Sequence, residues 1–213
     1  MNKICILFLL FLLSCGQSSS EHSSPSDTIS NTLEVKSFEG FIKNEAWKSD
    51  WSFFIYKALS NSVLHSLTDI NINLIDLNQM NCSNYNELSN HEKSLFLVVY
   101  FATIAKLESD FNPRNKTGTN LGLLQIDMKS AIRHYRDIDL HSNIEISLFD
   151  PNFNLLIGLH IFKNQISGFH TSRTKGRLLP EGNYYWEVLN LNFRNKFLKT
   201  FFKYSNNLYF CNK

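Results

Sequence analysis

The chain has 213 residues, of which 43% are hydrophobic and 14% aromatic, and its formal net charge at pH 7 is +2. This composition excludes an intrinsically disordered chain, and without a long basic run nucleic acid is not expected as the main partner. Only 8 glycines and 4 prolines occur. They favour a helical fold over a turn-rich β-sandwich, in a length that suits one domain with a substantial core.

The N-terminus has the organisation of an export signal. Lys3 precedes an apolar run from Ile4 to Leu13, which is too short to span a bilayer and fits a signal-peptide core. The run ends in Leu-Leu-Ser-Cys, which is similar to the processing site of bacterial lipoproteins, where the cysteine, here Cys15, is acylated. Residues 1–14 are therefore expected to be a lipoprotein signal peptide. An ordinary signal peptide with an incidental cysteine is the alternative.

A tether is expected to follow the lipidated cysteine. Gly16 follows Cys15, as in lipoproteins sent to the outer membrane, so we expect a lipid-anchored protein of the bacterial cell envelope that faces the periplasm. Seven serines between Ser18 and Ser30 leave little to bury. Residues 15–44 are interpreted as the lipidated cysteine and a Ser-rich tether, and residues 45–213 as the folded domain.

Two cysteines, Cys82 and Cys211, lie outside the signal and the lipidation site. In an exported protein, two such thiols predict a disulfide. Two separate free thiols are the alternative.

Helical patterns begin shortly after the tether. Apolar residues at helical spacing predict an amphipathic helix over residues 51–67. Ser89 and Glu92 have the spacing of a capping box and predict the start of the next helix. From Leu95 to Leu107 that helix is apolar on nearly every face, so we expect it to be central and buried. It should end near Asn112-Pro113, because proline disfavours a helical residue before it.

The second half of the chain is also predicted to be mainly helical. A small irregular hairpin is expected between residues 116 and 124, and a short helix over residues 127–136. Asp150 and the proline after it predict a helix that stops before Gly168. Residues 171–183 are expected to form a polar loop. A last helix is expected over residues 185–204, with five core candidates: Trp186, Leu189, Phe193, Phe197 and Phe201.

Four motifs together resemble the soluble-lytic-transglycosylase-type (SLT) domain of the lysozyme-like superfamily. They are "ESDFNP" from Glu108, "GLLQI" from Gly122, "FDPNFN" before Gly158, and "YYWEVL" from Tyr184, a Tyr-Trp variant of the family's C-terminal region. The resemblance implies an all-α fold, of the α+β lysozyme-like kind with minimal β-structure, in a single globular domain with a substrate cleft. It also implies a peptidoglycan lytic transglycosylase that breaks the MurNAc–GlcNAc β-1,4 bond without a cofactor.

The position of Glu108 suits the acid that such a reaction needs. An exposed glutamate has a pKa near 4.3 and is ionised at neutral pH. At the end of an apolar helix, desolvation raises the pKa, so that the carboxyl group keeps a proton to donate. We therefore expect Glu108 to be the single catalytic acid and base. A solvent-facing glutamate at a helix end is the alternative.

The resemblance implies further contacts to the glycan. The hydroxyl of Thr117 is expected to hydrogen-bond an N-acetyl group, and the amide of Gln125 to point at a sugar in the cleft. Gly122 is expected to let the backbone approach the ligand closely. Tyr184 or Tyr185 is expected to hydrogen-bond Glu108 from the last helix. Turn capping by Thr117, helix capping by Gln125 and burial of the tyrosines in the core are the structural alternatives.

A hydrolytic outcome stays open because of Asp127. The segment from Gly122 to Asp127 is also similar to that of goose-type lysozymes, in which an aspartate follows the same residues. Asp127 would then position a water in a lysozyme-like muramidase, although it is also suited to capping the helix that follows.

Two other classes of protein are disfavoured by the sequence. A non-catalytic glycan-binding lipoprotein is disfavoured by the presence of both Glu108 and Gln125. A metalloenzyme is disfavoured because the seven histidines form no His-Glu-x-x-His pattern. The expected partners are peptidoglycan strands and, through the lipid, a membrane, and the expected state is a monomer.

Overall fold

The computed structural model describes residues 37–44, 46–60, 62–134, 144–169, 171–182 and 184–212. The helices are α2 (Ser49–Ser60), α3 (Ser62–His65), α4 (Leu74–Gln79), α5 (Asn90–Ser109), α6 (Met128–His134), α7 (Ile144–Ser147), α8 (Pro151–Ile166) and α9 (Arg194–Tyr204). The strands are β1 (Lys116–Thr117), β2 (Asn120–Leu121) and β3 (Ile126–Asp127). The expected helical fold with minimal β-structure is confirmed.

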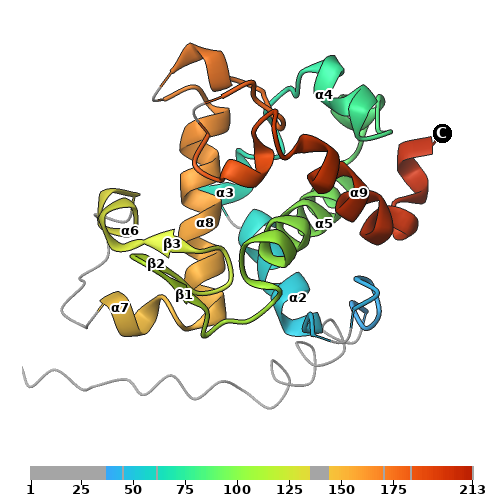
Figure 1. Cartoon of the computed structure of the whole chain (residues 1–213). Coiled ribbons are helices and arrows are strands. Elements are labelled where there is room, and N and C mark those ends of the chain that lie inside the picture. Colours follow the sequence, from blue (N-terminus) through green and yellow to red (C-terminus); the bar gives the residue numbers. More distant parts are fainter. Residues whose placement is uncertain are drawn as a thin grey trace, which may run out of the picture.

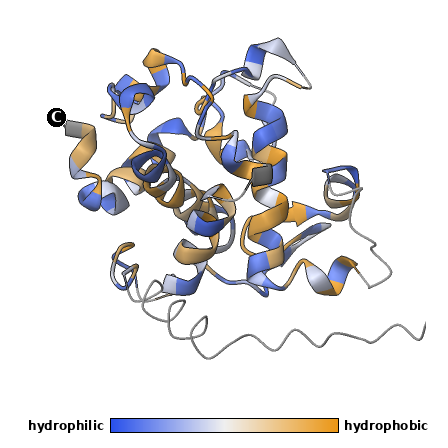
Figure 2. Cartoon of the chain, turned by 180° about the vertical axis from the view of Figure 1, so that it is seen from behind, coloured by the Kyte–Doolittle hydropathy of each residue, from blue (hydrophilic) through white to orange (hydrophobic). Residues whose placement is uncertain are grey.

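Helix α8 stands between two groups of elements (Figure 1). The small sheet, α6 and α7 lie on one side of it, and α5, α9 and α4 lie on the other. Helices α5 and α8 carry long runs of hydrophobic residues (Figure 2). The core therefore forms where α2, α5, α8 and α9 meet.

The central helix α5 agrees with its prediction. Its first turn is closed by the capping box of Ser89 and Glu92, in which each side chain bonds the other residue's backbone N–H. Nearly every residue from Phe96 to Ala105 is buried. The helix ends at Ser109, a little before Asn112-Pro113, because Asp110 adopts a left-handed backbone conformation with φ 55°.

The N-terminal helical region differs from its prediction. The helix expected over residues 51–67 is divided into α2 and α3. Phe38 and Ile42, which precede the expected start of the domain at residue 45, are buried and belong to the packed structure. Cys15, the expected signal peptide and most of the expected tether lie outside the described residues.

The three strands form one antiparallel sheet in the order β1-β2-β3. The first two strands confirm the expected hairpin, and the third leads directly into α6, which confirms the expected short helix. Asp150 caps α8 by accepting a hydrogen bond from the backbone N–H of Phe153 at 2.8 Å. The sheet, α6 and α8 are thereby held as one unit.

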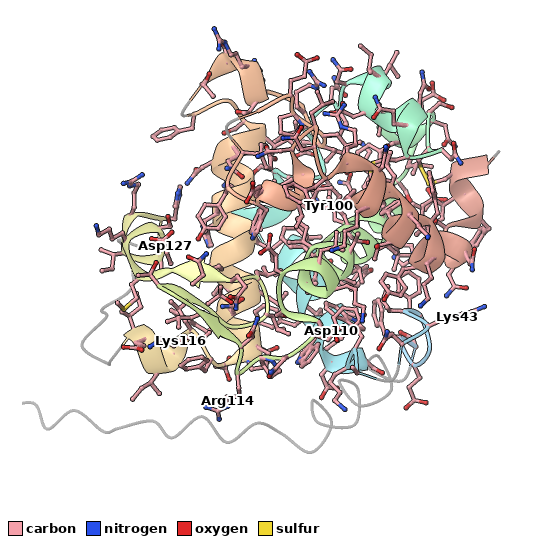
Figure 3. The ribbon with its side chains drawn as sticks, in the orientation of Figure 1. Lys43, Tyr100, Asp110, Arg114, Lys116 and Asp127 are labelled. Atoms are coloured by element: carbon pink, nitrogen blue, oxygen red, sulfur yellow. A yellow bond between two sulfur atoms is a disulfide. The ribbon has the colours of Figure 1, made fainter. Side chains whose placement is uncertain are left out.

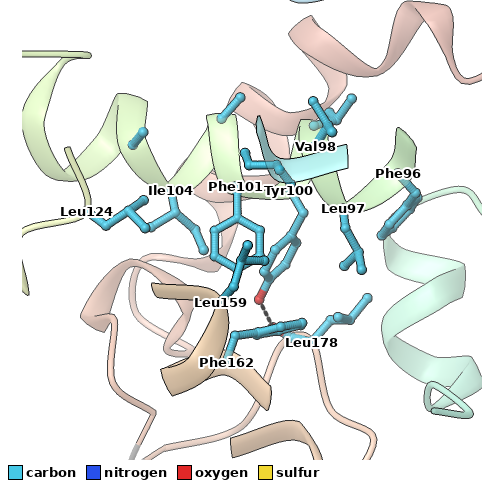
Figure 4. Close-up of a cluster of buried hydrophobic side chains, with 14 of the residues drawn as sticks. Phe96, Leu97, Val98, Tyr100, Phe101, Ile104, Leu124, Leu159, Phe162 and Leu178 are labelled. Atoms are coloured by element: carbon cyan, nitrogen blue, oxygen red, sulfur yellow. Dashed lines mark hydrogen bonds between the residues drawn. The ribbon is translucent and has the colours of Figure 1, made fainter. Parts of the chain in front are cut away.

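The segment expected to be a polar loop, residues 171–183, packs partly into the protein. Leu178 and Leu179 are fully buried. Their backbone N–H groups donate to the carboxylate of Asp76 at 2.7 and 2.9 Å, and the Arg177 guanidinium binds the same carboxylate at 3.0–3.2 Å. The hydroxyl of Tyr100 donates to the carbonyl of Leu178 (Figure 4). This network ties the segment to α4 and α5.

The last helix is shorter than predicted. The helix α9 begins at Arg194 rather than at residue 185, and residues 187–189 form a single 3₁₀ turn. Phe193 is 40% exposed, so its prediction as a core residue was wrong. The other four core candidates of this region are buried: Trp186, Leu189, Phe197 and Phe201.

A disulfide joins Cys82 to Cys211, as the sequence predicts. Cys82 lies shortly before α5, and Cys211 lies in the short 3₁₀ helix Tyr209–Asn212 that follows α9. The bond therefore holds the C-terminal region against the start of the central helix. None of the helices in the described ranges combines the length and hydrophobicity that crossing a bilayer requires.

Candidate active site

Glu108 lies in the last turn of α5, where the chain leaves the core and turns toward the sheet. The turn is made by Asp110 and Phe111, which both have positive φ angles, 55° and 65°. Figure 3 shows Asp110 at the end of α5 and Asp127 at the start of α6. Because α5 fixes its backbone, Glu108 is placed at the boundary between the core and solvent.

The environment of Glu108 favours its neutral form. Burial first, and the negative charge of Glu187 second, together raise the pKa of the carboxyl group to about 7. Among the described residues, no side chain or backbone group hydrogen-bonds this carboxyl group. Near neutral pH Glu108 therefore retains a proton in a large fraction of molecules, which is the property that a general acid requires.

Glu187 is a residue of this site that sequence reasoning missed. It follows Trp186, which is 2% exposed and whose indole N–H donates to the carbonyl of Leu124 at 2.8 Å. The Trp186 ring also contacts the ring of Phe101 of α5, with centroids 6.1 Å apart. Trp186 thus anchors the 3₁₀ turn against α5 and brings the exposed Glu187 side chain close enough to act on Glu108.

Gln125 has a different position from the one expected. It is 4% exposed, and its amide nitrogen donates to the carbonyls of Asn115 and Gly122 at 3.1 and 2.9 Å. The amide N–H groups therefore do not point at a ligand, because they are bound to the loop itself. The side-chain oxygen is buried and has no hydrogen-bond partner among the described residues. Gln125 closes the loop that runs from Glu108 to the sheet.

Gly122 is required for packing within the protein. Its φ is +77°, and a Cβ atom there would lie 2.2 Å from the carbonyl oxygen of Leu148 and 2.4 Å from the Asn154 amide nitrogen. Asn154 in turn hydrogen-bonds the backbone of Leu121, Leu124 and Leu148 at 2.8–2.9 Å. This packing explains the glycine within the protein, and a contact of its backbone with substrate stays a prediction.

Asp127 is held by two neighbours. One carboxylate oxygen accepts the backbone N–H of Ser130 at 2.9 Å and so caps α6, and the other accepts the Tyr185 hydroxyl at 3.0 Å. Partial burial raises the pKa of Asp127, but the hydrogen bonds from Ser130, Tyr185 and the backbone of Lys129 outweigh it, and the pKa lies below its ordinary value. Asp127 is therefore an ionised carboxylate at neutral pH.

The two tyrosines do not make the contact expected of them. The Tyr185 hydroxyl also accepts the backbone N–H of Asp127 at 2.9 Å. Tyr184 is buried, and its hydroxyl donates to the carbonyl of Arg177 at 3.3 Å. Neither hydroxyl bonds Glu108, because Tyr185 is occupied by Asp127 and Tyr184 by the segment before it. Thr117 is exposed on β1, where its hydroxyl is open to solvent.

Within the described residues, no group of three or more metal-binding side chains comes together. The site consists of a half-buried neutral carboxyl group, a nearby exposed carboxylate, and an ionised aspartate held by a tyrosine. This arrangement provides a proton donor beside negative charge, which suits acid-assisted cleavage of a glycosidic bond.

Residues 85–179 match the family model of the transglycosylase SLT domain. This stretch of the chain is an SLT domain. Among solved structures, Bd0314 DslA in its wild-type form 2 has a TM-score of 0.58 and 21% identity over 77% of this chain and 92% of its own. Two of its glutamate-to-glutamine mutants have the same TM-score and coverage, at 22% and 21% identity. The likeness shows a shared fold. No curated protein matches the chain.

The matched range divides the site residues into two groups. Glu108, Thr117, Gly122, Gln125 and Asp127 lie within the SLT domain. Tyr184, Tyr185 and Glu187 follow its matched range and are brought to the site by the packing of Trp186. The SLT domain therefore contains Glu108, and the segment after it contributes the nearby negative charge of Glu187.

Replacing Glu187 by glutamine is expected to move the pH dependence of activity toward lower pH. The proton on Glu108 is lost as the pH rises through about 7, so activity that needs this proton falls above that pH. A neutral residue at position 187 removes the repulsion that opposes ionisation of Glu108, and its pKa falls. The measurement is the pH profile of kcat/KM for glycan release.

A matched control for this profile is Glu87→Gln. Glu87 is an exposed glutamate in the 3₁₀ helix Tyr85–Glu87, before α5, and it is not among the groups that shift the pKa of Glu108. Its replacement should leave the profile unchanged. An alkaline limb that stays in place in the Glu187→Gln variant would show that Glu187 does not influence the acid.

Proposed function

We propose that the protein is a peptidoglycan lytic transglycosylase that cleaves the β-1,4 bond between MurNAc and GlcNAc and leaves a 1,6-anhydroMurNAc end. The observation that carries this proposal is Glu108, which lies in the SLT domain at the end of α5 with a pKa raised to about 7. A protonated carboxyl group at neutral pH is what the departure of a sugar oxygen requires.

In the proposed reaction Glu108 acts twice. Its proton moves to the glycosidic oxygen as the bond between that oxygen and C1 of MurNAc breaks. The resulting Glu108 carboxylate then removes the proton of the C6 hydroxyl of the same MurNAc, and O6 bonds to C1. The carboxyl group is thereby restored to its starting protonation state, and neither a metal nor an organic cofactor is needed.

Other residues are assigned supporting parts in this reaction. Thr117, which is exposed on β1, is assigned a contact with the glycan through its hydroxyl. Gln125, buried and bonded to Asn115 and Gly122, shapes the loop between the acid and the sheet. Tyr185 orients Asp127 through the bond between their side chains.

A hydrolytic muramidase is the second candidate, and the state of Asp127 favours it. Hydrolysis uses a second carboxylate either as a nucleophile or as a base for water. Asp127 is ionised and held in place by Ser130 and Tyr185, as such a base must be. However, each oxygen of this carboxylate already accepts a hydrogen bond, from Ser130 or from Tyr185, and these bonds lower its pKa and make it a weaker base, so we favour the transglycosylase.

Mass spectrometry of the products of sacculus digestion distinguishes the two reactions. Anhydro ends on the released muropeptides are expected, and reducing ends would instead establish the muramidase. Sacculi with acetylated and with deacetylated glycans should both be tested. If neither kind of sacculus releases any product, both enzymatic proposals are rejected and a non-catalytic glycan-binding lipoprotein takes their place.

We also propose that the enzyme is anchored in the bacterial envelope by a lipid on Cys15, at the outer membrane and facing the periplasm. The lipoprotein-like signal at residues 1–14 and the serine-rich residues after it support this location. Incorporation of a labelled fatty acid, lost in a Cys15→Ala variant, is the expected result. Unchanged labelling of that variant would contradict lipidation at this residue.

A further inference from the structure

A concave region lies next to the residues that bind Asp127. It is a pocket of about 330 Å³ between α6, α8 and the segment from Thr171 to Tyr185. Its lining includes Ser130 and Tyr185, the two residues whose groups bind the carboxylate of Asp127. The pocket therefore shares Ser130 and Tyr185 with the surroundings of Asp127 in the candidate active site.

The lining mixes apolar and polar side chains and carries a positive charge. Arg133 of α6 lies on it, and this guanidinium has no ion-pair or hydrogen-bond partner among the described residues. The hydroxyl-bearing residues Ser130 and Thr171 also lie on it, and Ile161 supplies an apolar patch. A guanidinium with five N–H donors and no acceptor of its own is suited to binding a carboxylate or phosphate.

Gln165 of α8 adds a second, independent indication of a ligand. Its side-chain oxygen is buried and accepts no hydrogen bond within the described part of the chain, and the residue lines the pocket. A buried acceptor without a donor is unfavourable, so it marks a place where a donor from outside the protein would be stabilising. The site thus offers a cation for an anion and an acceptor for an N–H group.

The positive surface continues beyond this pocket. A neighbouring pocket of about 560 Å³ is lined by Arg173 and Arg177 and by one acidic residue, Glu181, and Thr171 lines both pockets. Arg177 is committed to Asp76, whereas the guanidinium of Arg173 is unpaired among the described residues. Thr171 is therefore shared by two pockets, one lined by Arg133 and the other by Arg173.

A peptide with free carboxylates fits this surface better than a sugar does. The sugars of a glycan strand bring hydroxyl and N-acetyl groups, which are neutral. Peptide side branches of the strand bring backbone N–H donors together with carboxylates, the two partners that Gln165 and Arg133 lack. A sugar would leave the guanidinium without a counter-charge.

We propose that the pocket between α6, α8 and residues 171–185 binds the carboxylate-bearing stem peptide of the glycan strand, with Arg133 as the residue that pairs with a peptide carboxylate. This inference rests on the proposed function. It assigns the enzyme a substrate that is recognised by its peptide as well as by its sugar backbone, with the peptide lying along α6 while the glycosidic bond lies at Glu108.

The test compares three soluble substrates of equal sugar length with the full-length protein. The first carries stem peptides, the second has lost them to an amidase and keeps only the lactyl carboxylates, and the third is a chitin oligosaccharide with neither. Arg133→Gln should raise KM on the peptide-bearing strand about fivefold to tenfold at unchanged kcat. On the amidase-treated strand it should change KM little.

The control variant is Lys196→Gln, which removes the same charge from an exposed residue of α9 that lines neither pocket. It should leave all three substrates unaffected. Equal losses of Arg133→Gln on the peptide-bearing and the amidase-treated strands would assign the arginine to the lactyl carboxylate and overturn the peptide proposal. No change on either strand would also overturn it.

Failure of this inference and failure of the proposed function give different results. If the protein lacks transglycosylase and muramidase activity, the wild type cleaves none of the three substrates. In that case binding of uncleaved peptide-bearing strands, measured by calorimetry for the wild type and Arg133→Gln, still tests the pocket. If only the inference fails, the wild type cleaves the strands and the arginine variant matches it on every one.

Discussion

Replacing Glu108 by glutamine is expected to lower kcat for peptidoglycan cleavage by about 10²–10⁴-fold, the contribution of a positioned general acid. Glutamine has nearly the same shape as a protonated glutamate, but it has no acidic proton to give to the leaving oxygen. Because the Glu108 carboxyl group has no hydrogen-bond partner among the described residues, the substitution leaves no group of the protein unpaired. Binding of the glycan should therefore persist.

The measurement is release of soluble muropeptides, together with sedimentation of the variant with intact sacculi. Glu87→Gln serves again as the matched control, because Glu87 is an exposed glutamate in the 3₁₀ helix before α5. It should keep full activity. A Glu108→Gln variant that releases product at the wild-type rate would remove the basis of the proposed mechanism.

Loss of the Cys82–Cys211 disulfide is expected to cause a large fall in stability. The two cysteines are 129 residues apart, and closing a loop of that length in the unfolded chain corresponds to about 4–5 kcal/mol in the chain-entropy model. Alanine at both positions should lower the free energy of unfolding by an amount of this order, measured by urea denaturation under non-reducing conditions.

Reduction provides the control for this experiment. Dithiothreitol should destabilise the wild type and have no further effect on the double-alanine variant. The disulfide lies far along the chain from Glu108, so below its unfolding midpoint the variant should retain glycan cleavage. A double variant as stable as the wild type would show that the bond contributes nothing beyond the packing of the region around Phe210 and Tyr85, which is already buried.

Local signals in the sequence predicted the parts of the fold that local interactions determine. The capping box at Ser89 and the Asp150-Pro151 pair specify the starts of α5 and α8 through bonds within one helical turn. Apolar residues on every face of α5 predicted its central position, because such a helix is stable only when other elements surround it.

Predictions failed where a contact between distant residues determines the conformation. Residues 171–183 look polar, yet Leu178 and Leu179 are buried because Asp76, about a hundred residues earlier in the chain, accepts their backbone N–H groups. The last helix was predicted to begin too early, because the indole of Trp186 enters the core and bonds Leu124 instead of continuing a helix. Neither contact can be predicted from the sequence immediately around the residues that make it.

In the candidate site, too, local sequence predicted some features, and those that depend on contacts between distant residues were not predicted. The resemblance to the SLT domain located Glu108, and the apolar helix before it explained why its pKa is raised. Gln125 was predicted to point its amide at a sugar, whereas its bonds to the loop were not predicted, since they depend on a positive φ of 48° and on the path of the loop at Asn115. Glu187 was missed because only the three-dimensional packing of Trp186 brings it to the acid.

The pairing of Gly122 with Asn154 offers a marker for finding distantly related chains. The Asn154 amide saturates its two donors and its acceptor on backbone groups, and it occupies the space that a side chain at position 122 would need. Any larger residue at 122 would also meet the backbone carbonyl of Leu148, so a smaller residue at 154 would not make room for it and would lose the bonds that hold the hairpin to α8. Both residues should therefore be retained together, and aligned homologues can be screened for this pair even where overall similarity has faded.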